Sequence, residues 1–125
     1  MSNNLTAKIL LVEDDETLVE MYIMKFKEEN LNLLVAKEGE AGLALAQKEL
    51  PGLILLDIMM PKMDGFAVLT ALKKSEKTKE IPVLMLSNLG QEADIAKGKA
   101  LGAADYIVKS SMTPAELVAK IRTYL

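Results

Sequence analysis

Short apolar runs alternate with longer segments of helical character along the whole chain. The third run, Leu53-Ile54-Leu55-Leu56, is apolar at four consecutive positions and ends in Asp57. An unbroken run of this length is typical of a strand buried on both faces, as in a parallel sheet. By the same criterion, we predict β-strands at residues 7–12, 31–36, 53–57, 81–86 and 104–108.

Each predicted strand is followed by a predicted helix. The last helix has the clearest start, because Thr113 is a good N-cap, Pro114 suits the first helical position and Glu116 completes a capping box. In the first helix, Leu18, Tyr22 or Met21, and Phe26 form the inner stripe. The predicted helices span about 17–30, 38–49, 65–74 and 91–101, with the last one running from Thr113 to the end of the chain.

The helix at 91–101 contains a glycine, Gly98, in its interior. An interior glycine costs a helix about 1 kcal/mol relative to alanine. We therefore expect this helix to be the least stable of the five. The alternative explanation for Gly98 is close packing against a neighbouring element.

Strict alternation of strands and helices with short connections predicts an α/β fold. Such a chain forms a three-layer sandwich, in which a parallel sheet lies between helices and the crossovers are right-handed. We expect one domain over residues 1–125, with residues 1–6 as a flexible polar lead-in. Because the last predicted helix reaches residue 125, we expect no second domain within this sequence.

Composition excludes several classes of function. The chain has no cysteine and no histidine, which excludes disulfides, thiol chemistry, zinc sites and Ser-His or Cys-His catalysis. The net charge is −3 and no dense lysine or arginine cluster is present, so we expect no direct nucleic-acid binding. No signal peptide or membrane-spanning run is visible, so we expect a cytoplasmic protein without membrane contact.

Polar residues follow four of the five predicted strands, where a parallel sheet gathers its carboxyl ends. They are Glu13-Asp14-Asp15, Asp57, Ser87 and Lys109. Each alone has a simpler explanation, such as a solvated strand end or an acidic first turn of a helix. Their joint occurrence favours a common site at the edge where α/β sheets bind ligands. Gathered carboxylates repel one another unless a cation intervenes, and Mg²⁺ suits such a site.

This set of residues is suited to phosphoryl transfer. An aspartate such as Asp57 can act as a nucleophile and form an acyl phosphate. Lys109 supplies a positive charge and Ser87 a hydroxyl donor beside the transferred group. Catalysis of phosphoryl transfer consists mainly of positioning and charge neutralisation, which these groups provide.

Several motifs make the chain resemble the receiver domain of bacterial two-component response regulators. They are Ile-Leu-Leu-Val-Glu-Asp-Asp at 9–15, Leu-Leu-Asp-Ile-Met-Met-Pro at 55–61, Met-Asp-Gly at 63–65, Ser87, and Tyr-Ile-Val-Lys at 106–109. The resemblance covers about residues 8–125. It implies a flavodoxin-like doubly wound fold whose five strands follow the order 2-1-3-4-5.

The resemblance also assigns expected roles at the acidic end of the site. Asp57 looks like the phosphoacceptor, charged by a phosphohistidine of a sensor histidine kinase or a histidine phosphotransfer protein. Glu13 and Asp14 match the acidic pair, and Asp14 would bind Mg²⁺ together with Asp57 and the backbone carbonyl of Met59. Asp15 is expected to lie outside the pair, in the loop that leads into the first helix.

The remaining motif residues imply a switch. Lys109 matches the lysine that contacts the phosphoryl group, Ser87 the switch hydroxyl and Tyr106 the switch aromatic residue. Phosphorylation would shift the population towards a state in which Tyr106 turns inward. The surface of helix 91–101, strand 104–108 and the last helix would then bind a downstream target protein. We expect a monomer or a phosphorylation-dependent dimer.

Two features qualify the resemblance. The family usually has a proline joined by a cis bond after the lysine, whereas here Ser110 follows Lys109. We predict a trans bond, because a cis bond without proline costs about 3–4 kcal/mol. Apolar Met59 and Leu89 offer no group that could position a hydrolytic water. We therefore hypothesise slow self-dephosphorylation, which a phosphoryl lifetime of only seconds would contradict.

The leading interpretation is a stand-alone phosphorylatable receiver that acts in trans and is not a conventional enzyme. The alternative is a receiver-fold interaction module that works without phosphorylation, although such a module would not need the complete residue set. An aspartate-based phosphatase would resemble Asp-x-Asp, but Met59 stands two residues after Asp57. A flavodoxin would need a phosphate loop and flanking aromatic residues, which the sequence lacks.

Overall fold

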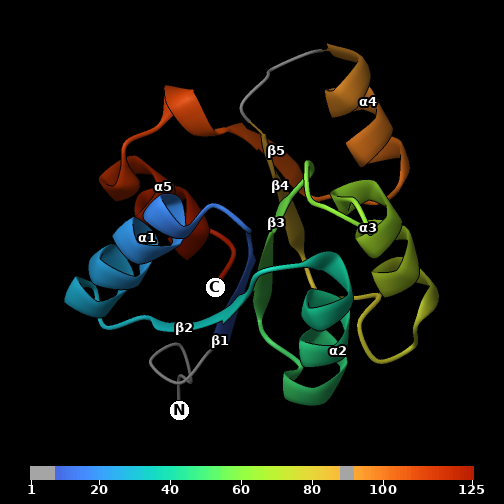
Figure 1. The fold of residues 1–125 in the computed structure, drawn as a ribbon, viewed down its shortest axis with the longest axis horizontal. Helices are drawn as coiled ribbons and strands as arrows, with labels where there is room; N and C mark the ends of the chain where they lie inside the picture. Colours follow the sequence, from blue (N-terminus) through green and yellow to red (C-terminus); the bar gives the residue numbers. More distant parts are fainter. Residues whose placement is uncertain (1–7, 88–91) are drawn as a thin grey trace.

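The protein is a three-layer α/β sandwich (Figure 1). A computed structural model describes residues 8–87 and 92–125. Five parallel strands form one sheet in the order β2-β1-β3-β4-β5, as expected. Helices α1 and α5 cover one face of the sheet, and α2, α3 and α4 lie on the other.

Strands and helices alternate as predicted, with boundaries that differ by a few residues. The strands are β1 (Lys8–Val12), β2 (Asn32–Ala36), β3 (Leu53–Asp57), β4 (Val83–Ser87) and β5 (Asp105–Val108). The helices are α1 (Glu16–Glu28), α2 (Gly39–Glu49), α3 (Gly65–Lys74), α4 (Glu92–Ala100) and α5 (Pro114–Arg122), with a short 3-10 helix, η1 (Lys109–Ser111), before α5.

Each face of the sheet carries its own apolar core. In β3, Ile54 and Leu56 belong to the cluster beneath α2 and α3. Leu53 and Leu55 belong to the cluster beneath α1 and α5. Successive side chains of a strand point to opposite faces, so an unbroken apolar run supplies both cores. The prediction of a strand buried on both faces is confirmed, since all five residues of β3 are buried.

Helix α1 starts at Glu16, one residue earlier than predicted. Asp15 is its N-cap, because Oδ1 of Asp15 accepts hydrogen bonds from the backbone N–H groups of Thr17 and Leu18 at 3.0 and 3.2 Å. The helix ends at Glu28, and Asn30 then adopts a left-handed conformation with φ of 59°. A residue in this conformation ends the helix.

The inner stripe of α1 differs partly from the predicted one. Tyr22 and Phe26 are buried, whereas Met21 is 42% exposed, so Tyr22 is the inward residue of the two considered. Val19 takes the third buried position, and Leu18 is only partly buried. The side chain of Leu18 lies at the margin of the α1–α5 core rather than at its centre.

The strand predicted at 81–86 begins two residues later than predicted, at Val83. Ile81 and Pro82 precede β4, and the carbonyl of Ile81 accepts a hydrogen bond from Nζ of Lys73 at 2.8 Å. At its other end, Ser87 is the last residue of β4 and not the first residue of the loop. The predicted flexibility of residues 1–6 and the predicted helix start at Gln91 lie outside the described residues.

The peptide bond between Lys109 and Ser110 is trans, as predicted, because the described residues contain no cis peptide bond. Helix η1 was not predicted. It holds the backbone from Lys109 to Ser111 where the family pattern has a proline turn. Within the described ranges, no helix has both the length and the apolar character needed to cross a membrane.

Candidate functional site

The strand order determines where the site lies. Strand β1 pairs with β2 on one side and with β3 on the other. The chain therefore winds in opposite directions from β1 and β3, which creates a crevice at the carboxyl ends of these two strands. Glu13 directly follows β1, and Asp57 is the last residue of β3. Both carboxylates consequently lie beside this crevice.

Three carboxylates converge there. Glu13, Asp14 and Asp57 each offer an oxygen atom, and these atoms lie within 4.8 Å of one another. Glu13 and Asp57 are 1% and 4% exposed, whereas Asp14 is exposed to solvent. A cluster with one open side and only oxygen donors fits Mg²⁺, which keeps several waters and binds through one or two carboxylates.

Lys109 enters the cluster from the end of β5. Its Nζ forms an ion pair with Oε1 of Glu13 and lies 3.2 Å from Oδ1 of Asp57. The lysine side chain is only 9% exposed. A buried ammonium between two buried carboxylates offsets part of their mutual repulsion. Lys109 is thus held where a positive charge faces both acids.

Burial governs the protonation of Glu13. Desolvation, together with the charge of Asp57, raises the pKa of Glu13 to about 7, although the hydrogen bond from Lys109 acts in the opposite direction. Burial also acts to lower the pKa of Lys109, but the hydrogen bond to Glu13 and the charges of Asp57 and Glu13 outweigh it and raise that pKa. Three carboxylates face this one ammonium, so a bound cation would offset the remaining negative charge.

Asp15 does not join this cluster through its carboxylate, which caps α1. Its backbone N–H instead donates to Oε2 of Glu13 at 3.1 Å. This hydrogen bond and the ion pair with Lys109 together engage both oxygens of Glu13. The orientation of Glu13 is accordingly fixed from two sides.

Ser87 and Tyr106 lie on the strands that complete this side of the sheet. Asp57 pairs in register with Leu86, so Ser87 extends one residue beyond it on the neighbouring strand. Ser87 is 4% exposed. Tyr106 lies on β5, opposite Met85 on β4. It is partly buried and packs against the core beneath α2 and α3.

The loop between β3 and α3 is held close to Asp57 by a glycine. The backbone N–H of Gly65 donates to the carbonyl of Ile58 at 2.9 Å. A Cβ atom at Gly65 would overlap the carbonyl oxygen of Asp57 and would lie 2.8 Å from Cα of Ile58. From the sequence, Gly65 was recognisable only as part of the Met-Asp-Gly motif at 63–65, because its close approach to Asp57 comes from tertiary packing.

Met59 lies in the same loop, and its side chain is 72% exposed. Lys62 has φ of 69°, and the N–H of Met63 donates to the carbonyl of Pro61 at 2.8 Å, which defines a tight turn. Leu89, the second residue of the dephosphorylation hypothesis, lies outside the described residues. That hypothesis stays a prediction.

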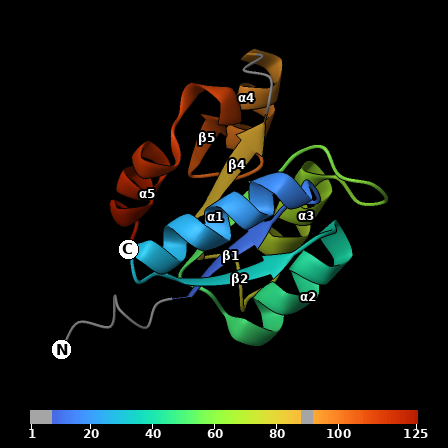
Figure 2. The ribbon, with the colours of Figure 1, turned by 60° about the vertical axis from the view of Figure 1, so that its left-hand side comes forward.

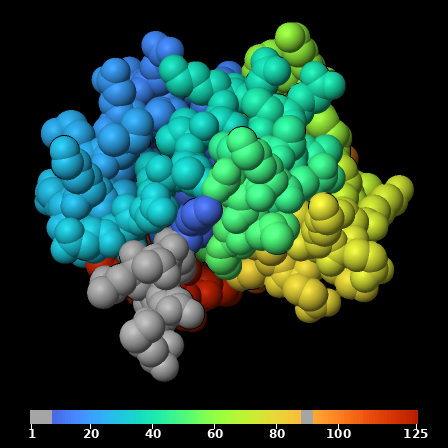
Figure 3. All heavy atoms as spheres, turned by 90° about the horizontal axis from the view of Figure 1, so that it is seen from below, coloured from blue at the N-terminus to red at the C-terminus, as the bar shows by residue number. Residues whose placement is uncertain are grey.

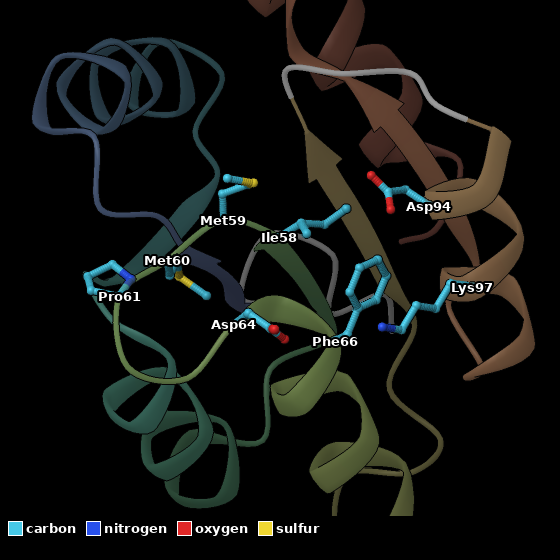
Figure 4. Close-up of a pocket in the computed structure, with 8 residues that line it drawn as sticks. All are labelled: Ile58, Met59, Met60, Pro61, Asp64, Phe66, Asp94 and Lys97. Carbon is cyan, nitrogen blue, oxygen red and sulfur yellow. The ribbon is translucent and has the colours of Figure 1, made fainter.

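A pocket of about 580 Å³ lies beside this loop, between it and α4 (Figure 4). The Phe66 ring forms part of its wall, and Nζ of Lys97 sits 4.5 Å from the ring centroid. Asp94 and Lys97 contribute from α4, and Asp64 contributes from the start of α3. The pocket was not predicted, because helices distant in sequence form its walls.

Known proteins share both the sequence pattern and the fold. The family described as the response regulator receiver domain matches residues 9–122. A probable transcriptional regulator, ycf27 of Cyanophora paradoxa, is 40% identical over 118 residues, which cover 94% of this chain and 48% of that protein. The chain thus spans about half the length of the curated relatives it matches.

Solved structures share the fold of this chain. Chemotaxis protein CheY4 of Vibrio cholerae has a TM-score of 0.88 at 30% identity, covering 95% of this chain and 98% of that chain. The Mn²⁺-bound form of response regulator Rcp1 has a TM-score of 0.81 at 30% identity, covering 94% of this chain and 92% of that chain.

Proposed function

Because the chain belongs to the response regulator receiver domain family, we propose that it is a phosphorylatable signalling module with Asp57 as phosphoacceptor. The observation that carries this proposal is the buried Lys109 ammonium, 3.2 Å from Oδ1 of Asp57. This cation lies beside Asp57, the acid that ends the fully buried strand β3.

The donor is a phosphohistidine of a sensor histidine kinase or of a histidine phosphotransfer protein. A carboxylate oxygen of Asp57 forms a bond to phosphorus while the bond from phosphorus to the imidazole nitrogen breaks, and the nitrogen keeps the electron pair. Lys109 offsets negative charge on the transferred group. Ser87 supplies a hydroxyl donor to the same group.

The acidic cluster fits a divalent cation. Glu13, Asp14 and Asp57 would hold Mg²⁺, with the backbone carbonyl of Met59 as a further oxygen ligand. When bound, Mg²⁺ supplies charge neutralisation for the phosphoryl oxygens. Three carboxylates that face a single ammonium support a site that favours an added positive charge.

Phosphorylation of Asp57 would change the surface that binds a downstream protein. Ser87 and Tyr106 lie on the neighbouring strands β4 and β5, so a shift of Ser87 towards phosphorylated Asp57 would accompany a rearrangement of Tyr106. The surface formed by α4, β5 and α5 would then bind a target protein. The regulation of transcription by the longer relatives is a property of those proteins.

The test is phosphorylation by acetyl phosphate, followed by intact mass. We expect a gain of one phosphoryl group that requires both Mg²⁺ and Asp57. An Asp57→Asn variant should gain none, whereas Asp94→Asn, a matched substitution on α4, should gain it normally. Phosphorylation that persists in Asp57→Asn would refute the assignment. No gain in the wild type would favour the phosphorylation-independent interaction module.

A further inference from the structure

Strand β2 is the outermost strand on its side of the sheet and lies between α1 and α2 (Figure 2). The carbonyl of Ala36 accepts a hydrogen bond from the N–H of Glu13 at 3.0 Å. In a parallel ladder, every second residue of a strand faces a given neighbour. The backbone groups of Asn32, Leu34 and Ala36 therefore point to β1, and those of Leu33 and Val35 point outward.

The outward backbone groups of Leu33 and Val35 are available for pairing. Among residues 8–87 and 92–125, none forms a hydrogen bond with them. The strand has the sequence Asn-Leu-Leu-Val-Ala, which contains no charge and no proline. By contrast, the opposite edge strand, β5, carries Asp105, which Lys120 contacts at 2.8 Å. Natural proteins usually protect edge strands with charges or proline, and β2 lacks both.

A groove of about 470 Å³ runs beside this edge on the α2 side. Its apolar part includes Ala41, Ala44 and Leu45 of α2. Two lysines, Lys37 and Lys48, also line it, and both are exposed. β2 and α2, coloured cyan to green, lie together on the surface seen from the amino ends of the strands (Figure 3).

We propose that the β2 edge and this groove bind an extended, acidic segment of a partner protein by β-strand addition. The outward backbone groups of Leu33 and Val35 would pair with the added strand. Alternate side chains of that strand would enter the groove, where apolar ones contact Ala41, Ala44 and Leu45 of α2. Acidic side chains would meet Lys37 and Lys48 at the groove's margin.

The positive charges of the two lysines in the groove favour an acidic partner segment. Two lysines line this groove in a chain whose net charge is −3, so they attract a segment of the opposite sign. Lys37 already contacts Glu16 at 2.9 Å, but both side chains of that pair are exposed and contribute little. A second copy of this chain, docked symmetrically, would meet this groove with a groove that carries the same two lysines, and like charges on the two surfaces disfavour that pairing.

The test uses three labelled nonapeptides and the full chain. The first alternates valine with glutamate, and the second alternates valine with lysine. The third is the first peptide with its central residue replaced by proline. We expect only the first to bind, measured by fluorescence anisotropy. Its binding should slow amide exchange at Leu33 and Val35, because these N–H groups become hydrogen-bonded.

A charge-reversal pair completes the design. Lys48→Glu should weaken binding of the first peptide about tenfold, because an attraction becomes a repulsion. Lys77→Glu makes the same charge change on the connection between α3 and β4 and should alter binding less than about twofold. Absence of binding at millimolar concentration would overturn the proposal. So would equal binding of the lysine or proline peptide, exchange protection centred elsewhere, or self-association through β2 in sedimentation.

Discussion

At the residue scale, Glu13 shows how burial sets the chemistry of the site. Its carboxyl is 1% exposed, and burial, with the charge of Asp57, raises its pKa to about 7. The folded protein therefore holds a proton on Glu13 more tightly than the unfolded chain, whose glutamate has a pKa near 4.5. Stability linked to this group falls as the pH rises between these two values.

We predict that Glu13→Gln removes this pH dependence. Without divalent ions, the wild type should lose on the order of 3 kcal/mol of unfolding free energy relative to the variant between about pH 4.5 and pH 7. Urea denaturation of both proteins across this range measures the difference. Parallel stability curves for the two proteins would show that Glu13 titrates normally.

Gly65 is the second residue whose role depends on its surroundings. In Gly65→Ala, the added methyl group would overlap the carbonyl oxygen of Asp57, so the loop must move. We expect a loss of about 1–3 kcal/mol in unfolding free energy and slower phosphorylation by acetyl phosphate. Wild-type stability and rate in this variant would show that the loop adapts without cost.

At the element scale, α4 and α5 differ in how they are anchored. Among the helical residues described, α4 buries only Gly98, whereas α5 buries Leu117, Val118 and Ile121. Helix α5 also has a complete capping box at Thr113 and Glu116, as predicted. We therefore predict faster amide hydrogen exchange in α4 than in α5. Equal protection of the two helices would contradict this.

A substitution at Gly98 tests whether this interior glycine accounts for the faster exchange expected in α4. A Cβ atom there would lie 3.5 Å from Cγ of Met85 and 3.9 Å from Ala103, which are ordinary contacts. Close packing therefore does not require glycine at this position. We predict that Gly98→Ala stabilises the protein by about 0.5–1 kcal/mol, measured by urea denaturation, and slows exchange in α4. A destabilised variant would show that α4 needs its glycine.

At the scale of the whole molecule, the site joins residues from opposite ends of the chain. Glu13 and Lys109, 96 residues apart, form an ion pair only in the folded state. A cation bound by the acidic cluster must therefore favour folding. At a hundredfold excess of Mg²⁺ over its dissociation constant, the gain is about 2.7 kcal/mol.

We predict that Mg²⁺ raises the thermal unfolding midpoint of the wild type in a concentration-dependent manner. Asp14→Asn should abolish most of this rise, because Asp14 is the exposed acid of the cluster. Asp94→Asn should retain it. Scanning calorimetry with and without Mg²⁺ provides the measurement. An equal rise in the wild type and Asp14→Asn would place cation binding elsewhere.

Residue order alone was enough to recognise the elements and the chemistry at their ends. Apolar runs and helix caps are local signals, so strand β3, the Thr113 cap and the acids at the carboxyl ends of β1 and β3 were recognisable without the fold. Alternation indicated a parallel sheet, whereas the strand order came from the family resemblance. The periodicity of apolar residues shows which face of an element is buried, but it does not show which other elements lie beside it.

Which groups meet, and how deeply they are buried, depends on how the elements pack together. The ion pair of Lys109 with Glu13, the raised pKa of Glu13 and the approach of Gly65 to Asp57 depend on contacts between distant segments. The same holds for the outward groups of β2, because β1 is the only strand beside it among the described residues. Burial and proximity come from packing, and no local pattern encodes them.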